Sequence, residues 1–186
     1  MRTLEEAYHS PRYGGFTLIE AIIALAITAV LLGVAVPAMD RMLAHHQLVT
    51  AQDELIASLQ HARYQAISSG RHTLLCPSSN GQQCVDGTHW ERGWAAGTYR
   101  STSASQLDGA PTLVNAGYPR LIIVSSDGRQ RIRFQPNGRA GGSNVTFTLC
   151  RAGHAEDALG LTLSLTGRIA TNKVTADAAR LCAASG

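Results

Sequence analysis

An apolar stretch over residues 16–39 limits what this chain can fold into more than any other feature. It follows two glycines, contains a single carboxylate, Glu20, and has Pro37 near its end. About 20 apolar residues are enough for a helix to span a bilayer. A carboxylate within such a helix is costly unless a partner pairs with it, so Glu20 is a functional candidate. Pro37 lacks an amide proton and is expected to kink the helix rather than end it.

The apolar pattern becomes amphipathic beyond Pro37. One helical face is traced by Leu48, Leu55, Leu59, Ala62 and Ala66. Gly70 follows two serines and is a suitable stop signal. The pattern therefore predicts one long helix from about 16 to 69. Its first half, 16–39, would lie in the membrane, and its amphipathic half, 40–69, would pack on a domain.

The residues before the apolar stretch do not form an ordinary secretory signal. Residues 1–15 are polar, with two arginines balanced by two glutamates. A secretory signal is basic at its start, and its small-residue cleavage site follows the apolar run. Here Gly14 and Gly15 precede the run. Cleavage after Gly15 would remove the polar leader and make Phe16 the new N-terminus. The alternative is a signal anchor that happens to contain a glutamate.

The remainder of the chain, residues 70–186, predicts one β-rich globular domain. Gly, Ser and Thr are frequent there, and short apolar or alternating segments recur. The expected strands are 71–75, 90–98, 121–125, 130–134, 145–150 and 161–165. Asp127-Gly128 is a hairpin turn signal between the third and fourth of these strands. The expected fold class is α+β, with a long kinked N-terminal helix packed on an antiparallel sheet.

The chain has four cysteines, and they follow a membrane-targeting segment. An even number in that context suits an oxidising compartment and two disulfides. Four cysteines allow three connectivities, and sequence alone does not choose among them. Local pairing is our prediction, as Cys76–Cys84 around a turn-rich loop and Cys150–Cys182 anchoring the tail. The alternative is a metal site, but no Cys-x-x-Cys pair or Cys/His cluster has zinc spacing, so neither metal nor cofactor is expected.

Positive charge is concentrated in the last third of the chain. Residues 120–186 hold nine basic and four acidic residues. Arg129, Arg131 and Arg133 alternate with other residues, so a strand would place all three on one face. Such a row suits phosphate contacts, but it also suits a solvated sheet face or an acidic neighbouring subunit. Further candidates, if the fold gathers them, are Arg139, Arg151 and Arg168.

Other features suggest no catalytic chemistry. The sequence has no Gly-x-Ser-x-Gly, phosphate-binding loop or paired-carboxylate pattern. We therefore expect no enzymatic activity; a membrane-tethered enzyme would need a pocket that contains an acid or base with a perturbed pKa. Trp90 and Trp94 either pack in the core or stack on nucleotides.

The N-terminal pattern resembles the type IV prepilin signature, in which glycine precedes Phe-Thr-Leu-Ile-Glu and an apolar helix. The resemblance implies cleavage after Gly15 by a prepilin peptidase and N-methylation of Phe16. It also implies that Glu20 pairs with the terminal amine of a neighbouring subunit. The type IV pilin fold would follow, with residence in the bacterial inner membrane before assembly. The mature chain would then join other pilins in a periplasmic or extracellular filament.

Four further segments resemble the GspH/FimT family of type IV pilin-like proteins. They are CPSSNGQQC with the following THWERGW, residues 55–67, FQPNGRAGGSNVTFTLC at 134–150, and LSLTGRIA at 163–170. Tyr64-Gln65 departs from the usual helix end. The family implies a minor pilin of a type IV pilus, the reading we favour, or a minor pseudopilin of type II secretion.

Some FimT-like proteins bind DNA during natural transformation, through a Gly-Arg-x-Arg motif. Gly167 and Arg168 match this motif, but Ala170 stands in place of its second arginine. Lys173 and Arg180 could supply charge nearby. The candidate residues for contacts to double-stranded DNA are Arg168, Lys173, Arg129, Arg131, Arg133 and Arg139.

Overall fold

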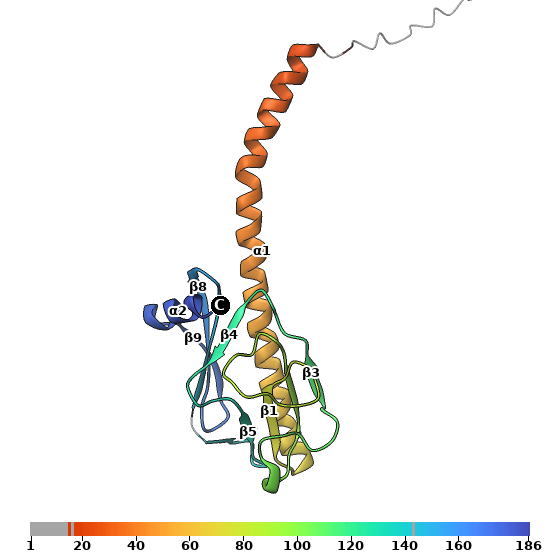
Figure 1. Ribbon diagram of the computed structural model, residues 1–186, viewed down its shortest axis with the longest axis vertical. Helices are drawn as coiled ribbons and strands as arrows, with labels where there is room; N and C mark the ends of the chain where they lie inside the picture. Colours follow the sequence, from red (N-terminus) through yellow and green to blue (C-terminus); the bar gives the residue numbers. More distant parts are fainter. Residues whose placement is uncertain (1–14, 16, 143) are drawn as a thin grey trace, which may run out of the picture. The chain divides into compact units, whose positions relative to one another are not determined.

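The computed structural model describes residue 15 and residues 17–142 and 144–186 (Figure 1). The chain divides into two compact units, Met1–Leu43 and Ala44–Gly186. One helix, α1, contributes residues to both units. In chain order the elements are α1 (Leu18–Ser69), β1 (Thr73–Pro77), β2 (Trp94–Thr98), η1 (Ser101–Ser103), β3 (Leu113–Asn115), β4 (Ile122–Ser125), β5 (Ile132–Phe134), β6 (Ala140–Gly141), β7 (Val145–Arg151), β8 (His154–Leu163), β9 (Ile169–Lys173) and α2 (Ala176–Ala184).

Helix α1 has well-defined ends. Thr17 and Glu20 form a capping box in which each side chain accepts a hydrogen bond from the other residue's backbone N–H. At the other end, Gly70 has a φ of 64°, the left-handed conformation that commonly terminates helices. The helix predicted from about 16 to 69 is therefore confirmed, within the residues that the structure describes.

The first unit exposes its apolar surface. All side chains described between residues 18 and 43 are solvent-exposed, including Leu18 at 79% and Val30 at 70%. Among the helices of the described residues, none is long and apolar enough to cross a membrane. The bilayer span expected over 16–39 stays a prediction.

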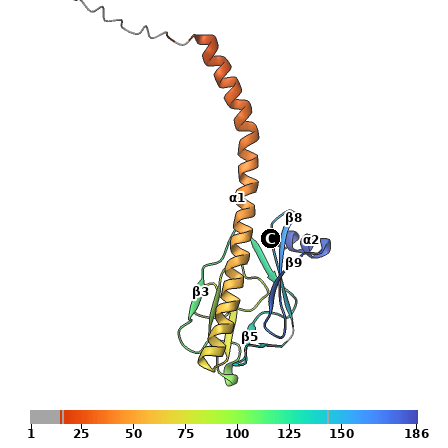
Figure 2. The same ribbon diagram turned by 180° about the vertical axis from the view of Figure 1, so that it is seen from behind.

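The second unit contains two antiparallel sheets (Figure 2). The strand order is β3-β2-β1-β5-β6 in the first sheet and β4-β7-β8-β9 in the second. Residues 44–69 of α1 supply the centre of the core. The helical face that is fully buried comprises Leu48, Ala51, Leu55, Leu59, Ala62 and Ala66. This face matches the predicted stripe.

Both sheets contact that helical face. Leu75 and Ala96 of the first sheet join the same buried cluster as Phe147 and Leu161 of the second. Two buried hydrogen bonds also join the helix to the sheets, one to each sheet. Trp94 on β2 donates from its indole N–H to Ser58 Oγ at 2.8 Å. Gln52 donates from its side-chain amide to the carbonyl of Gly160 on β8 at 2.9 Å.

The prediction of a β-hairpin around Asp127-Gly128 is wrong. The turn exists, since Gly128 has a φ of 72° and Arg129 N–H donates to the carbonyl of Ser126 at 3.0 Å. The strands on either side do not pair with each other. β4 pairs with β7 in the second sheet, and β5 pairs with β1 and β6 in the first. The turn therefore passes the chain from one sheet to the other.

The sequence reading also missed several elements. β3, β6, β9 and α2 were not expected, and β8 begins at His154 instead of Leu161. The C-terminal helix has a clear capping signal, because Thr175 accepts a hydrogen bond on its side chain from Ala178 N–H. Its short length and alanine-rich sequence hid the signal among the polar residues of the tail.

Candidate functional site

The N-terminal end of α1 is the first candidate site. Glu20 Oε2 accepts hydrogen bonds from the backbone N–H of Thr17 at 3.0 Å and from its hydroxyl at 2.9 Å. Within the described part of the chain, no group bonds to the second oxygen, Oε1, so this carboxylate can still accept a hydrogen bond from an ammonium group. Gly15 is exposed, whereas Phe16 and the rest of the predicted leader lie outside the described residues. The helix continues through Pro37.

The four cysteines form the two expected disulfides. Cys76 at the end of β1 is bonded to Cys84 and closes the loop between them. Cys150 on β7 is bonded to Cys182 on α2, which fixes the C-terminal helix against the second sheet. Each bridge is expected to stabilise the fold by about 2–4 kcal/mol, mainly by restricting the unfolded chain.

The two tryptophans belong to the core. Both are fully buried, and their indole N–H groups donate to Ser125 and Ser58. Trp90 packs edge-to-face on Phe147, with ring centroids 5.2 Å apart. Neither ring has a free face for a nucleotide, so the core interpretation of both residues is confirmed.

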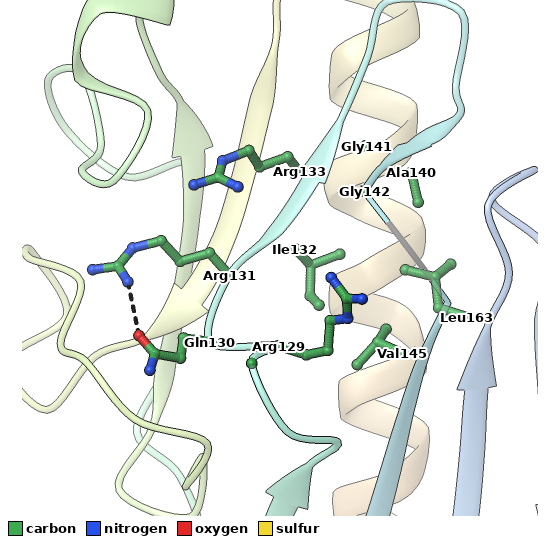
Figure 3. Close-up of a pocket in the computed structure, with 11 residues that line it drawn as sticks. Arg129, Gln130, Arg131, Ile132, Arg133, Ala140, Gly141, Gly142, Val145 and Leu163 are labelled. Atoms are coloured by element: carbon green, nitrogen blue, oxygen red, sulfur yellow. Dashed lines mark hydrogen bonds between the residues drawn. The ribbon is translucent and has the colours of Figure 1, made fainter.

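The expected row of three arginines is broken. Arg131 and Arg133 project from the same side of β5, but Arg129 lies in the preceding turn and points the other way (Figure 3). Arg131 is ion-paired with Asp86 at 2.8 Å and donates to the carbonyl of Ser105. Arg133 donates to the carbonyl of Ala104. These two arginines thus hold the 101–108 segment in place, and the predicted single basic face does not form.

The structure does gather another pair of candidate arginines. Arg139 and Arg168 each follow a glycine with positive φ, 75° at Gly138 and 81° at Gly167. The two turns touch, because a Cβ added to Gly167 would lie 2.3 Å from the carbonyl oxygen of Gly138.

Neighbouring backbone and side-chain groups hold these two turns together. Ala140 N–H donates to the carbonyl of Leu165 at 3.0 Å. Arg63 on α1 donates from Nε to the carbonyl of Gly138 at 3.0 Å. Arg139 and Arg168 are exposed. We call Arg63, Arg139 and Arg168 the paired-turn cluster.

Lys173 lies apart from this cluster. It ends β9, the outer strand of the second sheet, whereas Arg168 precedes the start of the same strand. Five residues of extended chain span roughly 17 Å. Arg180 is ion-paired with Asp177 on α2. Neither residue can therefore substitute for the second arginine of the Gly-Arg-x-Arg motif, whose position Ala170 occupies.

A cleft of about 200 Å³ lies between the sheets and contains the remaining candidate, Arg129. Its apolar walls come from Ile132 on β5, Val145 on β7 and Leu163 on β8 (Figure 3). The Arg129 guanidinium points among them. Arg131 and Arg133 also line the cleft, but their guanidinium groups extend in the other direction. The cleft is thus a partly enclosed site with one cation directed into it.

The start of β8 holds a polar cluster that the sequence spacing did not reveal. His154, Glu156 and Asp157 bring one potential ligand atom each within 4.8 Å of the others. Arg151 pairs with Asp157 at 2.5 Å, and His154 contacts Glu156 at 2.9 Å. The hydrogen bond from His154 lowers the pKa of Glu156 below its usual value. These contacts describe an ion-pair network at the turn after β7.

Comparison with known proteins relates this architecture to filament subunits. The family model "Type II transport protein GspH" matches residues 51–167, and the prokaryotic N-terminal methylation motif matches residues 10–36. The curated proteins contain no match to this chain.

Solved structures give a consistent result. The type IV minor pilin FimU of Pseudomonas aeruginosa matches in one crystal form with a TM-score of 0.57 and 24% identity, over 69% of this chain and 90% of FimU. A second crystal form of FimU matches with a TM-score of 0.55 and 25% identity, over 67% of this chain and 91% of FimU. The minor pseudopilin EpsH of the Vibrio cholerae type 2 secretion system matches with a TM-score of 0.47 and 14% identity, over 67% and 94%. The similarity to FimU confirms the expected type IV pilin fold.

The contact between the two turns yields a stability prediction. In Gly167→Ala, the methyl group meets the Gly138 carbonyl and the Arg63 side chain, and the positive φ is strained as well. We expect a loss of roughly 2–4 kcal/mol in the free energy of unfolding. Gly153→Ala is the matched control, because Gly153 has a φ of 74° and open space around it; it should lose only about 1–2 kcal/mol. Urea denaturation followed by circular dichroism measures both, and equal losses would contradict the packing argument.

Proposed function

Because this chain belongs to the GspH family of type II transport proteins, whose model covers residues 51–167, we propose that it is a minor subunit of a filament of the type IV pilus class. One observation carries the proposal. From Leu18 onward the segment that matches the N-terminal methylation motif is helical and has a capped carboxylate, and the apolar side chains described between residues 18 and 43 are all exposed.

That exposed surface needs a partner. Contiguous apolar patches larger than a few hundred Å² mark interaction sites on soluble proteins. Equivalent helices of neighbouring subunits would cover the apolar residues in a filament core. Residues 44–186, which have their own core and two disulfides, would lie on the outside.

Glu20 has a defined part in this assembly. Cleavage after Gly15 by a prepilin peptidase and methylation of Phe16 would give a charged N-terminal amine near Glu20. We propose that Glu20 Oε1, which accepts no hydrogen bond from another described residue, pairs with the terminal amine of an adjacent subunit. An ammonium and a carboxylate that leave water together need each other, because either one alone is strongly destabilising.

We place the filament in the type IV pilus and keep the type II secretion pseudopilus as the alternative. The resemblance to FimU at 25% identity supports the pilus. The description of the matching family model supports secretion. In both systems the mature chain would act as a structural subunit of a periplasmic or surface filament.

DNA capture is a second candidate function, favoured by the paired-turn cluster. Arg139 and Arg168 are exposed on touching turns, which presents two cations at one location. Phosphate contacts of this kind depend on salt and not on sequence. Ala170 occupies the position of the family's second arginine and carries no charge. Arg139 on the adjacent turn would supply that charge instead.

The role of Glu20 can be tested by substitution in living cells. Glu20→Ala and Glu20→Gln should both reduce incorporation into sheared filaments, measured by immunoblotting, by at least about a hundredfold, since an unpaired buried charge costs about 3–5 kcal/mol and each 1.4 kcal/mol is roughly tenfold. Thr17→Val, which removes hydroxyl contacts at the helix cap but keeps the carboxylate, is the control and should assemble. Normal incorporation of Glu20→Gln would show that the charge is not needed.

A deletion strain separates the two filament systems. If the chain serves a pilus, its loss should reduce piliation and DNA transformation and leave exoprotein levels in the culture medium unchanged. Re-expression of the intact chain should restore both properties. Impaired exoprotein secretion with normal piliation would overturn the pilus assignment and support the pseudopilus.

DNA binding can be measured with the full-length chain in mild detergent and a short DNA duplex at several salt concentrations. Arg139→Gln and Arg168→Gln should each weaken binding and reduce the slope of log affinity against log salt by about 0.9 for each phosphate that the variant no longer neutralises. Arg92→Gln, which removes the same charge from another exposed position, should have little effect. Absence of binding at low salt, or equal effects of all three variants, would exclude DNA capture by this cluster.

A further inference from the structure

We propose that the cleft between the sheets is a receptor for a carboxylate side chain, Asp or Glu, presented by a neighbouring subunit. The source of that carboxylate rests on the proposed function. The preference of the cleft for a carboxylate does not, since it follows from the position of Arg129 and from the walls around it.

Among the residues that the structure describes, the Arg129 guanidinium has no bonding partner. Among the described residues, no hydrogen bond or ion pair involves this side chain, although it is partly buried. The neighbouring arginines differ, because Arg131 and Arg133 are engaged by Asp86 and by backbone carbonyls. Partial burial weakens hydration of a cation, so an unpaired guanidinium there gains more from an incoming anion than one in open water would.

The backbone that carries Arg129 is firmly held. Its N–H donates to the carbonyl of Ser126 at 3.0 Å, and its own carbonyl accepts from Ser125 Oγ at 2.7 Å. Ser125 is buried and also accepts a hydrogen bond from the indole of Trp90. Little backbone ordering therefore remains to oppose binding, and such preorganisation favours affinity.

The walls select the class of anion. Ile132, Val145 and Leu163 provide apolar surface that suits the methylene groups of an acidic side chain. A planar guanidinium matches a carboxylate with two parallel hydrogen bonds. A phosphate of higher charge would need further donors. Arg131 and Arg133 also line the cleft, but their guanidinium groups extend away from that of Arg129 and are held by Asp86 and backbone carbonyls (Figure 3). A volume of about 200 Å³ also suits one side chain better than a strand of nucleic acid.

Nuclear magnetic resonance of the full-length chain, labelled with ¹⁵N-arginine and kept in mild detergent, tests the cleft directly. Sodium propionate is the probe, and sodium chloride at equal ionic strength is the reference. The Nε–Hε signal of Arg129, identified by its absence in Arg129→Gln, should shift and saturate with propionate only. The exposed Arg168 should respond equally to both salts.

Three results would overturn the proposal. They are no saturable shift of Arg129 with propionate, the same shift with chloride, and tighter binding of inorganic phosphate than of propionate. The titration of the wild-type chain tests carboxylate binding even if a variant folds poorly, since the remaining arginine signals report whether the cleft region is intact.

Filament incorporation then tests the neighbouring subunit as the source. Arg129→Gln should lower the incorporated fraction about tenfold, the effect of removing a charge-assisted hydrogen-bonded pair. Arg92→Gln removes the same charge from an exposed position and should assemble normally. If the wild-type chain itself is absent from filaments, the filament proposal fails while the propionate result still stands. Normal assembly of Arg129→Gln would remove the neighbouring subunit as the source of the carboxylate.

Discussion

The buried face of α1 between Leu48 and Ala66 is the interaction on which the rest of the globular unit depends. The side chains that the two sheets turn toward the helix enter one cluster around it, and the other buried clusters, around the two disulfides, are much smaller. Ser58 and Gln52 lie on the same helix and receive or donate a buried hydrogen bond, one to each sheet. A change in helix register would therefore break apolar packing and both polar contacts together, and this fixes where each sheet lies.

This dependence explains which parts of the fold the sequence could predict. The helix, its stripe and its stop at Gly70 follow from local periodicity and capping, which the chain carries in consecutive residues. The sequence also predicted the turn at Asp127-Gly128, but it did not predict which strands pair on either side of the turn. A turn signal states that the chain reverses and does not state which strand it will pair with; here β4 and β5 separate because each completes a different sheet.

The arginines show the same limit at the level of the site. Three of them, at 129, 139 and 168, follow a polar residue and a glycine of positive φ. The local sequence is nearly the same, yet Arg129 points into a cleft while Arg139 and Arg168 are exposed. Alternation placed Arg131 and Arg133 together correctly, but it failed for Arg129, whose backbone still belongs to the turn that begins at Ser126. Arg63 was not identified because its role depends on Gly138, which is 75 residues away.

The N-terminal cap shows how one side chain can have both a local and an intermolecular role. Both contacts from Thr17 reach the same oxygen of Glu20. A carboxylate has about four lone-pair sites, so these bonds leave capacity at Oε1. The cap holds the side chain in one orientation before any partner arrives, which reduces the entropy cost of pairing. A glutamine at position 20 could keep the geometry of the cap but not the negative charge. The cap geometry is what a residue needs to shape the helix, whereas the charge is what it needs to join two subunits.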